Sequence, residues 1–317
     1  MKINRLNRIS VVVALTGGLL GCGRMEPSEA DGAGSKPKVV VTTTMVSDLV
    51  KRVGGDSIEL VTLMGPGVDP HSYKLPARSV AELKGADAVI YSGLHLEGRM
   101  AELFEDMRAN GVPTLGVAET LAEEKLIGGE DAGGHADPHV WGDAKYWAGA
   151  IDGVVALLSE VVVGQAASFV ERGEVYRLEL EALDSWVGMR LAEVPSGRRV
   201  LVTSHDAFSY YGRAYGLEVV GLQGISTVDQ ASLAGMTKLV DLVKERGVRA
   251  IFVETSVNDA PIQRVAEDAG VRIGGTLFSD SAGVAGEMET AGGETYDVGT
   301  YTGMIKHNTN AIVEALK

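Results

Sequence analysis

The sequence predicts an α/β protein with two (β/α) lobes of mainly parallel sheets, a long rigid helix joining them, and a binding site in the interlobe cleft. Three observations lead to this fold class. Short apolar runs alternate with amphipathic stretches through both halves of the chain, which is typical of parallel sheets covered by helices. A chain of 317 residues suits two lobes of about 100–150 residues each. A stretch nearly free of helix breakers separates the two alternating series.

The N-terminus carries the pattern of an export signal. The basic segment "MKINRLNR" precedes an apolar run that ends at Cys22, which predicts a signal peptide over residues 1–21. The run is too short for a convincing membrane span, which needs about 20 apolar residues. "LLGC" also resembles a bacterial lipobox, which implies that Cys22 is lipidated; a plain secretory peptide is the alternative. Residues 22–37 are rich in Gly, Ser and Pro and predict a flexible tether.

Charge and cysteine content exclude several classes of protein. The 29 basic and 43 acidic residues give a net charge of -14 without a basic stripe, so we expect no nucleic-acid partner. Cys22 is the only cysteine, so an intrachain disulfide is impossible even in an oxidising compartment.

Two lobes follow the tether, which ends near Lys38. In the N-terminal lobe, residues 38–163, the strand-like runs are "KVVV", "SIELVTL" and "ADAVIYSG". In the C-terminal lobe, residues 196–317, they are "RRVLVTS", "LEVVGL" and "RAIFVETS", each followed by an amphipathic helix. The same order of elements in both lobes predicts parallel strands.

Residues 164–195 are predicted to form the helix that links the lobes. Apolar residues recur along it at helical spacing and form one stripe: Phe169, Tyr176, Leu180, Leu183, Val187 and Leu191. At 1.5 Å per residue, a helix over 165–194 is about 40 Å long, enough to cross both lobes. Two shorter helices broken near Gly173 or Gly188 are the alternative.

Four polar residues come just after predicted strands or in the loops between elements: His71, His139, His205 and Asp280. Ligand sites in open α/β sheets lie beyond the carboxyl ends of the strands, and two candidates fall in each half, so the interlobe cleft is the expected location. Three imidazoles and one carboxylate suit zinc, manganese or ferrous iron, whereas calcium and magnesium need more oxygen ligands. Spacing alone leaves open that each histidine is an ordinary core or surface residue.

Several blocks of the chain resemble a known family. They contain the motifs P-H-x-Y, D-P-H-V-W and H-D-A-F, and they occupy residues 65–100, 137–151, 203–232, 251–256, 274–283 and 300–316. In this order they resemble the metal-binding solute-binding proteins of bacterial ABC importers for manganese and zinc, the TroA/ZnuA-like group or cluster A-I. The resemblance covers residues 38–317. It implies two lobes, a rigid backbone helix and a metal ion between the lobes.

The resemblance also implies the metal ligands. Carried over motif by motif, they are His71, His139, His205 and Asp280. The metal is then Mn²⁺ or Zn²⁺, bound as cargo. A glutamate often stands in the manganese branch where this chain has His205, and a further nitrogen ligand favours zinc. The short loop at His135 argues against a dedicated zinc scavenger, so the choice of metal stays open.

Other residues are assigned to the structure and not to metal binding. His95 and His307 do not follow the ligand pattern, and we expect them to be structural. Glu254 either orients an imidazole through its other nitrogen or is an ordinary buried acid. The aromatic residues Trp141, Tyr146 and Trp147 are expected to pack the lobe. Ala77-Arg78 departs from the usual serine–aspartate pair, which puts only a helix cap in doubt.

The expected function is metal capture outside the cytoplasmic membrane. The resemblance implies a monomeric, membrane-anchored lipoprotein, periplasmic or on the cell surface, that delivers the ion to a permease–ATPase complex and is not an enzyme. We expect affinity to fall as the pH drops through the histidine pKa, near 6.5 if unperturbed. A zinc-dependent hydrolase with an open coordination position and a metal-stabilised surface adhesin are the alternatives.

Overall fold

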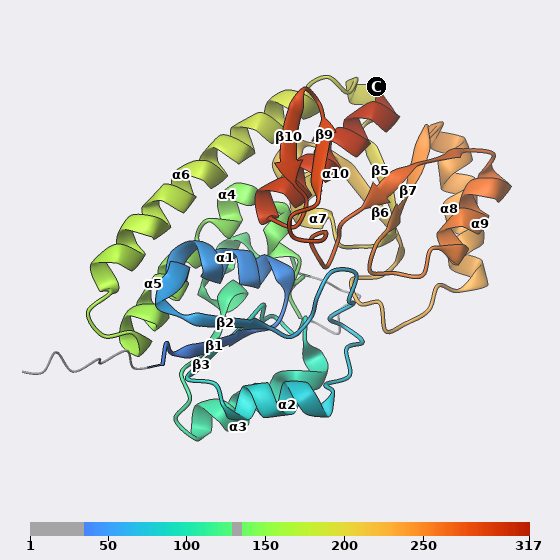
Figure 1. Ribbon diagram of the computed structural model, residues 1–317. Helices are drawn as coiled ribbons and strands as arrows, with labels where there is room; N and C mark the ends of the chain where they lie inside the picture. The colour runs from blue at the N-terminus through green and yellow to red at the C-terminus, as the bar shows by residue number, and fades with distance from the viewer. Residues whose placement is uncertain (1–34, 129–134) are drawn as a thin grey trace, which may run out of the picture. The chain divides into compact units, whose positions relative to one another are not determined.

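The computed structural model describes residues 35–128 and 135–317 (Figure 1). The predicted signal peptide and Cys22 lie outside these residues. Within them, no helix is both long and apolar enough to cross a membrane.

A four-stranded parallel sheet forms the first half. Its strands are β1 (Lys38–Val41), β2 (Glu59–Thr62), β3 (Ala88–Tyr91) and β4 (Thr114–Gly116), in the order β2-β1-β3-β4. Residues 39–41 and 88–90 are fully buried, which explains why β1 and β3 are continuous apolar runs. The associated helices are α1 (Thr44–Gly54), α2 (Ala77–Lys84) and α3 (Ala101–Ala109). The N-cap of α2 is Pro76, so no side chain caps this helix.

Two parallel strand pairs form the second half. They are β5 (Val200–His205) with β6 (Glu218–Gln223), and β7 (Ala250–Glu254) with β8 (Arg272–Leu277). Strands β5 and β7 lie side by side. The helices here are α7 (Ser209–Tyr215), α8 (Leu233–Arg246), α9 (Ala260–Ala269) and α10 (Tyr301–Leu316). The predicted α/β class with mainly parallel sheets is confirmed.

A single helix, α6 (Ala166–Leu191), follows α4 (Ala144–Trp147) and α5 (Ala150–Val161). Its 26 residues form one unbroken helix about 39 Å long, so the alternative of two shorter helices was wrong. The whole predicted apolar stripe is buried. Helix α6 packs on α1 and α5 from the first half and on α10 from the second, and Figure 1 shows it running past both.

The hydrophobic core continues from β1 through α6 to α10 as one cluster, and residues 36–317 form one compact unit. Because both halves share this core, no boundary separates them here, and the division into residues 38–163, 164–195 and 196–317 stays a prediction.

An antiparallel hairpin of β9 (Met288–Ala291) and β10 (Glu294–Asp297) was not predicted. Gly292 and Gly293 form its two-residue turn with φ of 61° and 83°, a conformation that favours glycine. Trp186 of α6 donates a hydrogen bond from Nε1 to Glu294 Oε1 at 3.2 Å, which attaches the hairpin to the long helix.

Candidate metal centre

Four separate loops and strand ends supply the side chains of the candidate site. His71 lies in the loop after β2, and His139 directly precedes a 3₁₀ turn at Val140–Gly142. His205 is the last residue of β5, and Asp280 follows the end of β8 by three residues. Three of the four residues, all except His139, thus lie at or after the carboxyl ends of parallel strands, as expected for an open α/β sheet.

The structure brings together all four residues that the sequence analysis singled out. One ligand atom of each lies within 4.8 Å of those of the other three. His71 is 6% exposed, and the other three are at most 1% exposed.

The distances between these atoms match a small coordination sphere. Nε2 of His71 lies 3.3 Å from Nε2 of His139, and that atom lies 3.3 Å from Asp280 Oδ1. Nε2 of His205 lies 3.4 Å from the other carboxylate oxygen, Oδ2. Ligands placed 2.0–2.2 Å from a tetrahedral ion are about 3.3–3.6 Å apart. Three nitrogens and a carboxylate at this spacing can hold one divalent ion.

Two buried carboxylates each bind one of these histidines at two points. Asp137 Oδ1 accepts from the backbone N–H of His139 at 2.9 Å and lies 2.7 Å from its Nδ1. Glu254 Oε1 accepts from the backbone N–H of His205 at 2.9 Å, while Oε2 lies 2.5 Å from its Nδ1. Both contacts leave Nε2 directed at the centre. Of the two alternatives for Glu254, the structure therefore shows the contact with an imidazole. The sequence analysis did not identify Asp137, although its position two residues before His139 could have indicated this contact.

His71 also follows an aspartate and a proline but has a different environment. Asp69 Oδ1 accepts from the backbone N–H of His71 at 2.9 Å, as Asp137 does for His139. The Oδ2 atom of Asp69 instead accepts from the hydroxyls of Ser72 and Thr227, both at 2.7 Å. Among the described residues, no carboxylate binds the outer ring nitrogen of His71.

Hydrogen bonds from the first half of the chain hold the segment around Asp280. The indole Nε1 of Trp141 donates to the carbonyl oxygen of Ser279 at 3.0 Å. The backbone N–H of Gly67 donates to Ser281 Oγ at 2.8 Å, and that of Ala282 donates to Thr44 Oγ1 at 2.7 Å.

Burial and neighbouring charges shift the pKa values of the three histidines in different directions. Burial lowers the pKa of His71 to about 4, despite the Asp280 carboxylate. Burial also disfavours the charged form of His139, but Asp137 and Asp280 outweigh it and raise the pKa of His139 to about 9. Glu254 and Asp280 likewise raise the pKa of His205 well above its usual value. For Asp280, the imidazoles of His205 and His139 overcome burial and hold its pKa well below the usual range.

Comparison with known proteins decides the family. The family described as "ZnuA: Zinc-uptake complex component A periplasmic" matches residues 39–315. The chain belongs to this family. Its description is that of an uptake component and not of an enzyme, so the prediction that the chain is not an enzyme is confirmed.

Two characterised proteins are similar to this chain over nearly their whole length. The manganese-binding lipoprotein MntA of Bacillus subtilis (strain 168) is 39% identical, with 99% of this chain and 100% of that protein covered. The zinc-binding protein TroA of Treponema pallidum (strain Nichols) is 40% identical, with 98% of each covered. The solved structure of the Treponema pallidum protein has a TM-score of 0.83 and covers 89% of this chain and 99% of that one.

The remaining histidines lie outside the four-residue cluster. His307 lies on α10, where its Nδ1 is 2.6 Å from Glu289 Oε2 and its Nε2 is 2.8 Å from the carbonyl oxygen of Thr276. His307 therefore joins α10 to β8 and β9, as expected of a structural residue. His95 and His135 are exposed, and their ring centroids are 3.9 Å apart.

The aromatic residues near D-P-H-V-W are packing residues, as predicted. Trp147 is fully buried, with its ring centroid 6.0 Å from that of Tyr301. Tyr146 stacks on Tyr210 at 5.9 Å. The Trp141 ring lies 5.3 Å from the His139 ring and forms one wall of the candidate centre.

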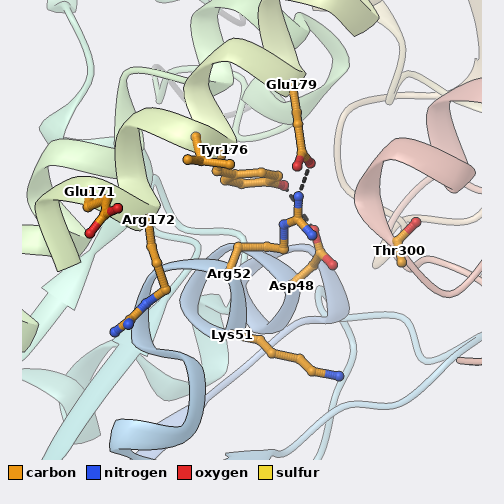
Figure 2. Close-up of a pocket in the computed structure, with 9 residues that line it drawn as sticks. Asp48, Lys51, Arg52, Glu171, Arg172, Tyr176, Glu179 and Thr300 are labelled. Atoms are coloured by element: carbon orange, nitrogen blue, oxygen red, sulfur yellow. Dashed lines mark hydrogen bonds and ion pairs between the residues drawn. The ribbon is translucent and has the colours of Figure 1, made fainter. Parts of the chain in front are cut away.

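A cavity of about 620 Å³ between α1 and α6 contains none of the four candidate ligands (Figure 2). Figure 2 shows Arg52 paired with Glu179 beside the Tyr176 ring. The Nε of Arg172 donates to the carbonyl oxygen of Val53 at 2.6 Å, and the Tyr176 hydroxyl donates to Asp48 at 2.9 Å. These polar and charged groups join α1 to α6. We therefore assign the cavity to the contact between the two helices and not to a binding site.

Proposed function

We propose that the protein is an extracytoplasmic solute-binding protein that captures Mn²⁺ or Zn²⁺ and delivers it to an ABC importer. The observation that carries the proposal is the buried cluster of three imidazoles and one carboxylate, with ligand atoms within 4.8 Å of one another. Membership of the ZnuA family and the names of the manganese- and zinc-binding relatives support the same function.

The proposed ligands are the Nε2 atoms of His71, His139 and His205 and the carboxylate of Asp280. Nitrogen donors with one carboxylate suit a borderline divalent transition metal. Four protein ligands leave no open position for an activated water, which argues against the zinc hydrolase. The similarity to a manganese-binding lipoprotein and to a zinc-binding protein argues against a purely structural metal in an adhesin.

The proposed location follows from the N-terminal sequence and the relatives. Residues 1–21 would direct export, and lipidated Cys22 would anchor the chain through the tether at 22–37. Relatives named lipoproteins support this location. The partners are the permease and ATPase of the importer, and we propose that the binding protein acts as a monomer.

The test is a competitive titration of the metal-stripped protein with Mn²⁺ and Zn²⁺ against a chelator of known affinity. We expect one equivalent of metal to bind. His139→Ala should weaken binding by at least 100-fold because it removes a ligand and leaves Asp137 without its partner. His95→Ala, which changes an exposed histidine outside the cluster, is the matched control. Unchanged affinity in His139→Ala would refute the ligand assignment.

A further inference from the structure

A second polar cavity, which we call the outer chamber, adjoins the candidate metal centre. It has a volume of about 310 Å³ and lies between the loops that follow β2, β6 and β7. Its polar lining consists of Asp69, Gln223, Thr227, Gln230, Ser256 and Asn258.

Two residues of the outer chamber are bonded directly to proposed ligands. Asp69 Oδ1 accepts from the backbone N–H of His71 at 2.9 Å. On the opposite side, Ser256 Oγ donates to Asp280 Oδ2 at 3.1 Å. Asp69 and Ser256 therefore connect the lining of the chamber to His71 and Asp280 of the buried cluster. An ion must cross some wall of the cluster to reach it, and His71 is the most exposed of the four ligands.

The chemistry of the chamber suits a hydrated cation. Among the residues that line it, Asp69 is the only charged one, and the rest of its polar lining is amide and hydroxyl groups. A volume of about 310 Å³ corresponds to roughly ten waters at about 30 Å³ each, so an ion with six waters fits. An anion would meet the Asp69 carboxylate and no lysine or arginine in this lining.

Hydrogen bonds fix the position of the Asp69 carboxylate in the lining of the chamber. Its Oδ2 accepts from Ser72 Oγ and from Thr227 Oγ1, both at 2.7 Å, and Thr227 belongs to the loop after β6. The carboxylate thus bridges two of the three loops that enclose the cavity.

We propose that the outer chamber is a second, transient binding site that holds a hydrated divalent cation beside Asp69 before it passes between His71 and Asp280. This inference rests on the proposed function. Asp69 raises the local concentration of the cation and so the association rate, while the four buried ligands set the final affinity.

The experiment is stopped-flow binding of Mn²⁺ and Zn²⁺ to the purified full-length protein. Tryptophan fluorescence provides the signal because the Trp141 ring lies 5.3 Å from the His139 ring. Asp69→Asn keeps an acceptor for the His71 N–H but removes the charge, and it should slow association about three- to tenfold at low salt. The difference should shrink at 0.15 M salt, where the screening length is about 8 Å. Asp241→Asn, the same change on the exposed face of α8, should leave the rate unchanged.

Asp69→Glu separates charge from local geometry. The Glu variant keeps the carboxylate charge but alters the turn between residue 69 and His71. If the charge sets the association rate, this variant should bind at nearly the wild-type rate. A slow Glu variant with a fast Asn variant would overturn the proposal, as would equal rates for Asp69→Asn and Asp241→Asn. If the wild-type protein binds neither metal, the proposed function itself fails. Circular dichroism of each variant confirms that it is folded.

Discussion

The three histidines of the cluster differ in the partner of their outer ring nitrogen. Asp137 binds that of His139 and Glu254 that of His205, each also accepting from the backbone N–H of the same residue. For His71, no carboxylate within residues 35–128 and 135–317 contacts the outer ring nitrogen, and Asp69 accepts from the backbone N–H alone. Two imidazoles are therefore held in orientation by a carboxylate before an ion arrives, and the third has no such carboxylate among the described residues.

Glu254→Gln should lower metal affinity about 10- to 100-fold without unfolding the protein. The amide keeps the size of the side chain but removes the charge beside His205 Nδ1, which makes the imidazole a weaker ligand. Competition titration measures the affinity, and Glu245→Gln, on an exposed part of α8, is the control. Equal affinities of the two variants would mean that Glu254 is an ordinary buried acid.

Metal binding at neutral pH should release about two protons. In the metal-free protein the raised pKa values of His139 and His205 keep both imidazoles charged at pH 7, while His71, with its pKa lowered to about 4, is neutral and has no proton to release. Affinity should therefore rise roughly 100-fold per pH unit between about pH 5 and 8 and less steeply above about pH 9, where His139 is neutral, instead of changing near 6.5 as the sequence alone led us to expect. Calorimetry in buffers of different ionisation enthalpy counts the protons, and a release near zero would contradict this assignment.

At this scale the positions of strands and loops singled out the four residues that meet, and the resemblance to a family was needed to assign them as ligands. Separations of 68, 66 and 75 residues carry no geometric information by themselves. Asp137 could not be distinguished from other loop acids, since its contact with His139 depends on the backbone conformation of the loop. The contact of Glu254 with His205 depends on β7 lying beside β5, and the pattern of strands in the sequence does not specify which strands are neighbours.

At the scale of elements, α6 contains two glycines in different surroundings. A Cβ at Gly173 would lie 3.0 Å from Ile151 Cγ2 and 3.1 Å from Val155 Cγ2, so this glycine permits the close approach of α5. A Cβ at Gly188 would meet no atom within 4 Å. One helix thus has a glycine at a tight contact and another in open space.

Gly188→Ala should stabilise the protein by up to about 1 kcal/mol, because alanine has the higher helix propensity and the site is open. Gly173→Ala should stabilise it less or destabilise it, because Ile151 and Val155 must move. Urea denaturation of the two variants against the wild type measures the difference. If Gly173→Ala raised the free energy of unfolding more than Gly188→Ala does, Ile151 and Val155 would have to shift at little cost, which would contradict this prediction.

The elements that the sequence missed lack an apolar pattern. Strands β9 and β10 have four residues each and are mostly exposed or half-buried, so no alternation marked them, although Gly292-Gly293 is a turn signal. Strand β4 has three residues and is too short for a periodicity. By contrast β1, β3, β7 and the stripe of α6 are almost wholly buried, and these were the elements most clearly predicted.

At the scale of the whole molecule, residues from both halves of the chain form one core and one cluster. The core passes from β1 through α6 to α10. The segment around Asp280 accepts hydrogen bonds from Gly67 and Trp141 and donates one to Thr44. An ion bound to the four ligands would add a further connection between residues 71 and 280. Binding should therefore stabilise the entire compact unit and not only a loop.

Saturation with metal at about 100 times the dissociation constant should stabilise the protein by about 2.7 kcal/mol and raise the melting temperature by roughly 5–10 °C. Thermal denaturation followed by circular dichroism, with Mn²⁺ or Zn²⁺, measures the shift. His139→Ala at the same concentrations should show little change, and so should the wild type with Mg²⁺, which prefers oxygen ligands. An unchanged melting temperature of the wild type with both metals would mean that the native protein binds neither of them at these concentrations.

The spread of the four ligands along the chain has a consequence for when the ion can be acquired. An unfolded chain holds His71 and Asp280 more than 200 residues apart, so the coordination sphere does not exist until nearly the whole polypeptide has folded. If the chain crosses the membrane unfolded, it leaves the cytoplasm without cargo, whatever metals are abundant there. The first ions to meet a complete site are then those outside the cell membrane, so the place of folding selects the pool from which the metal is drawn.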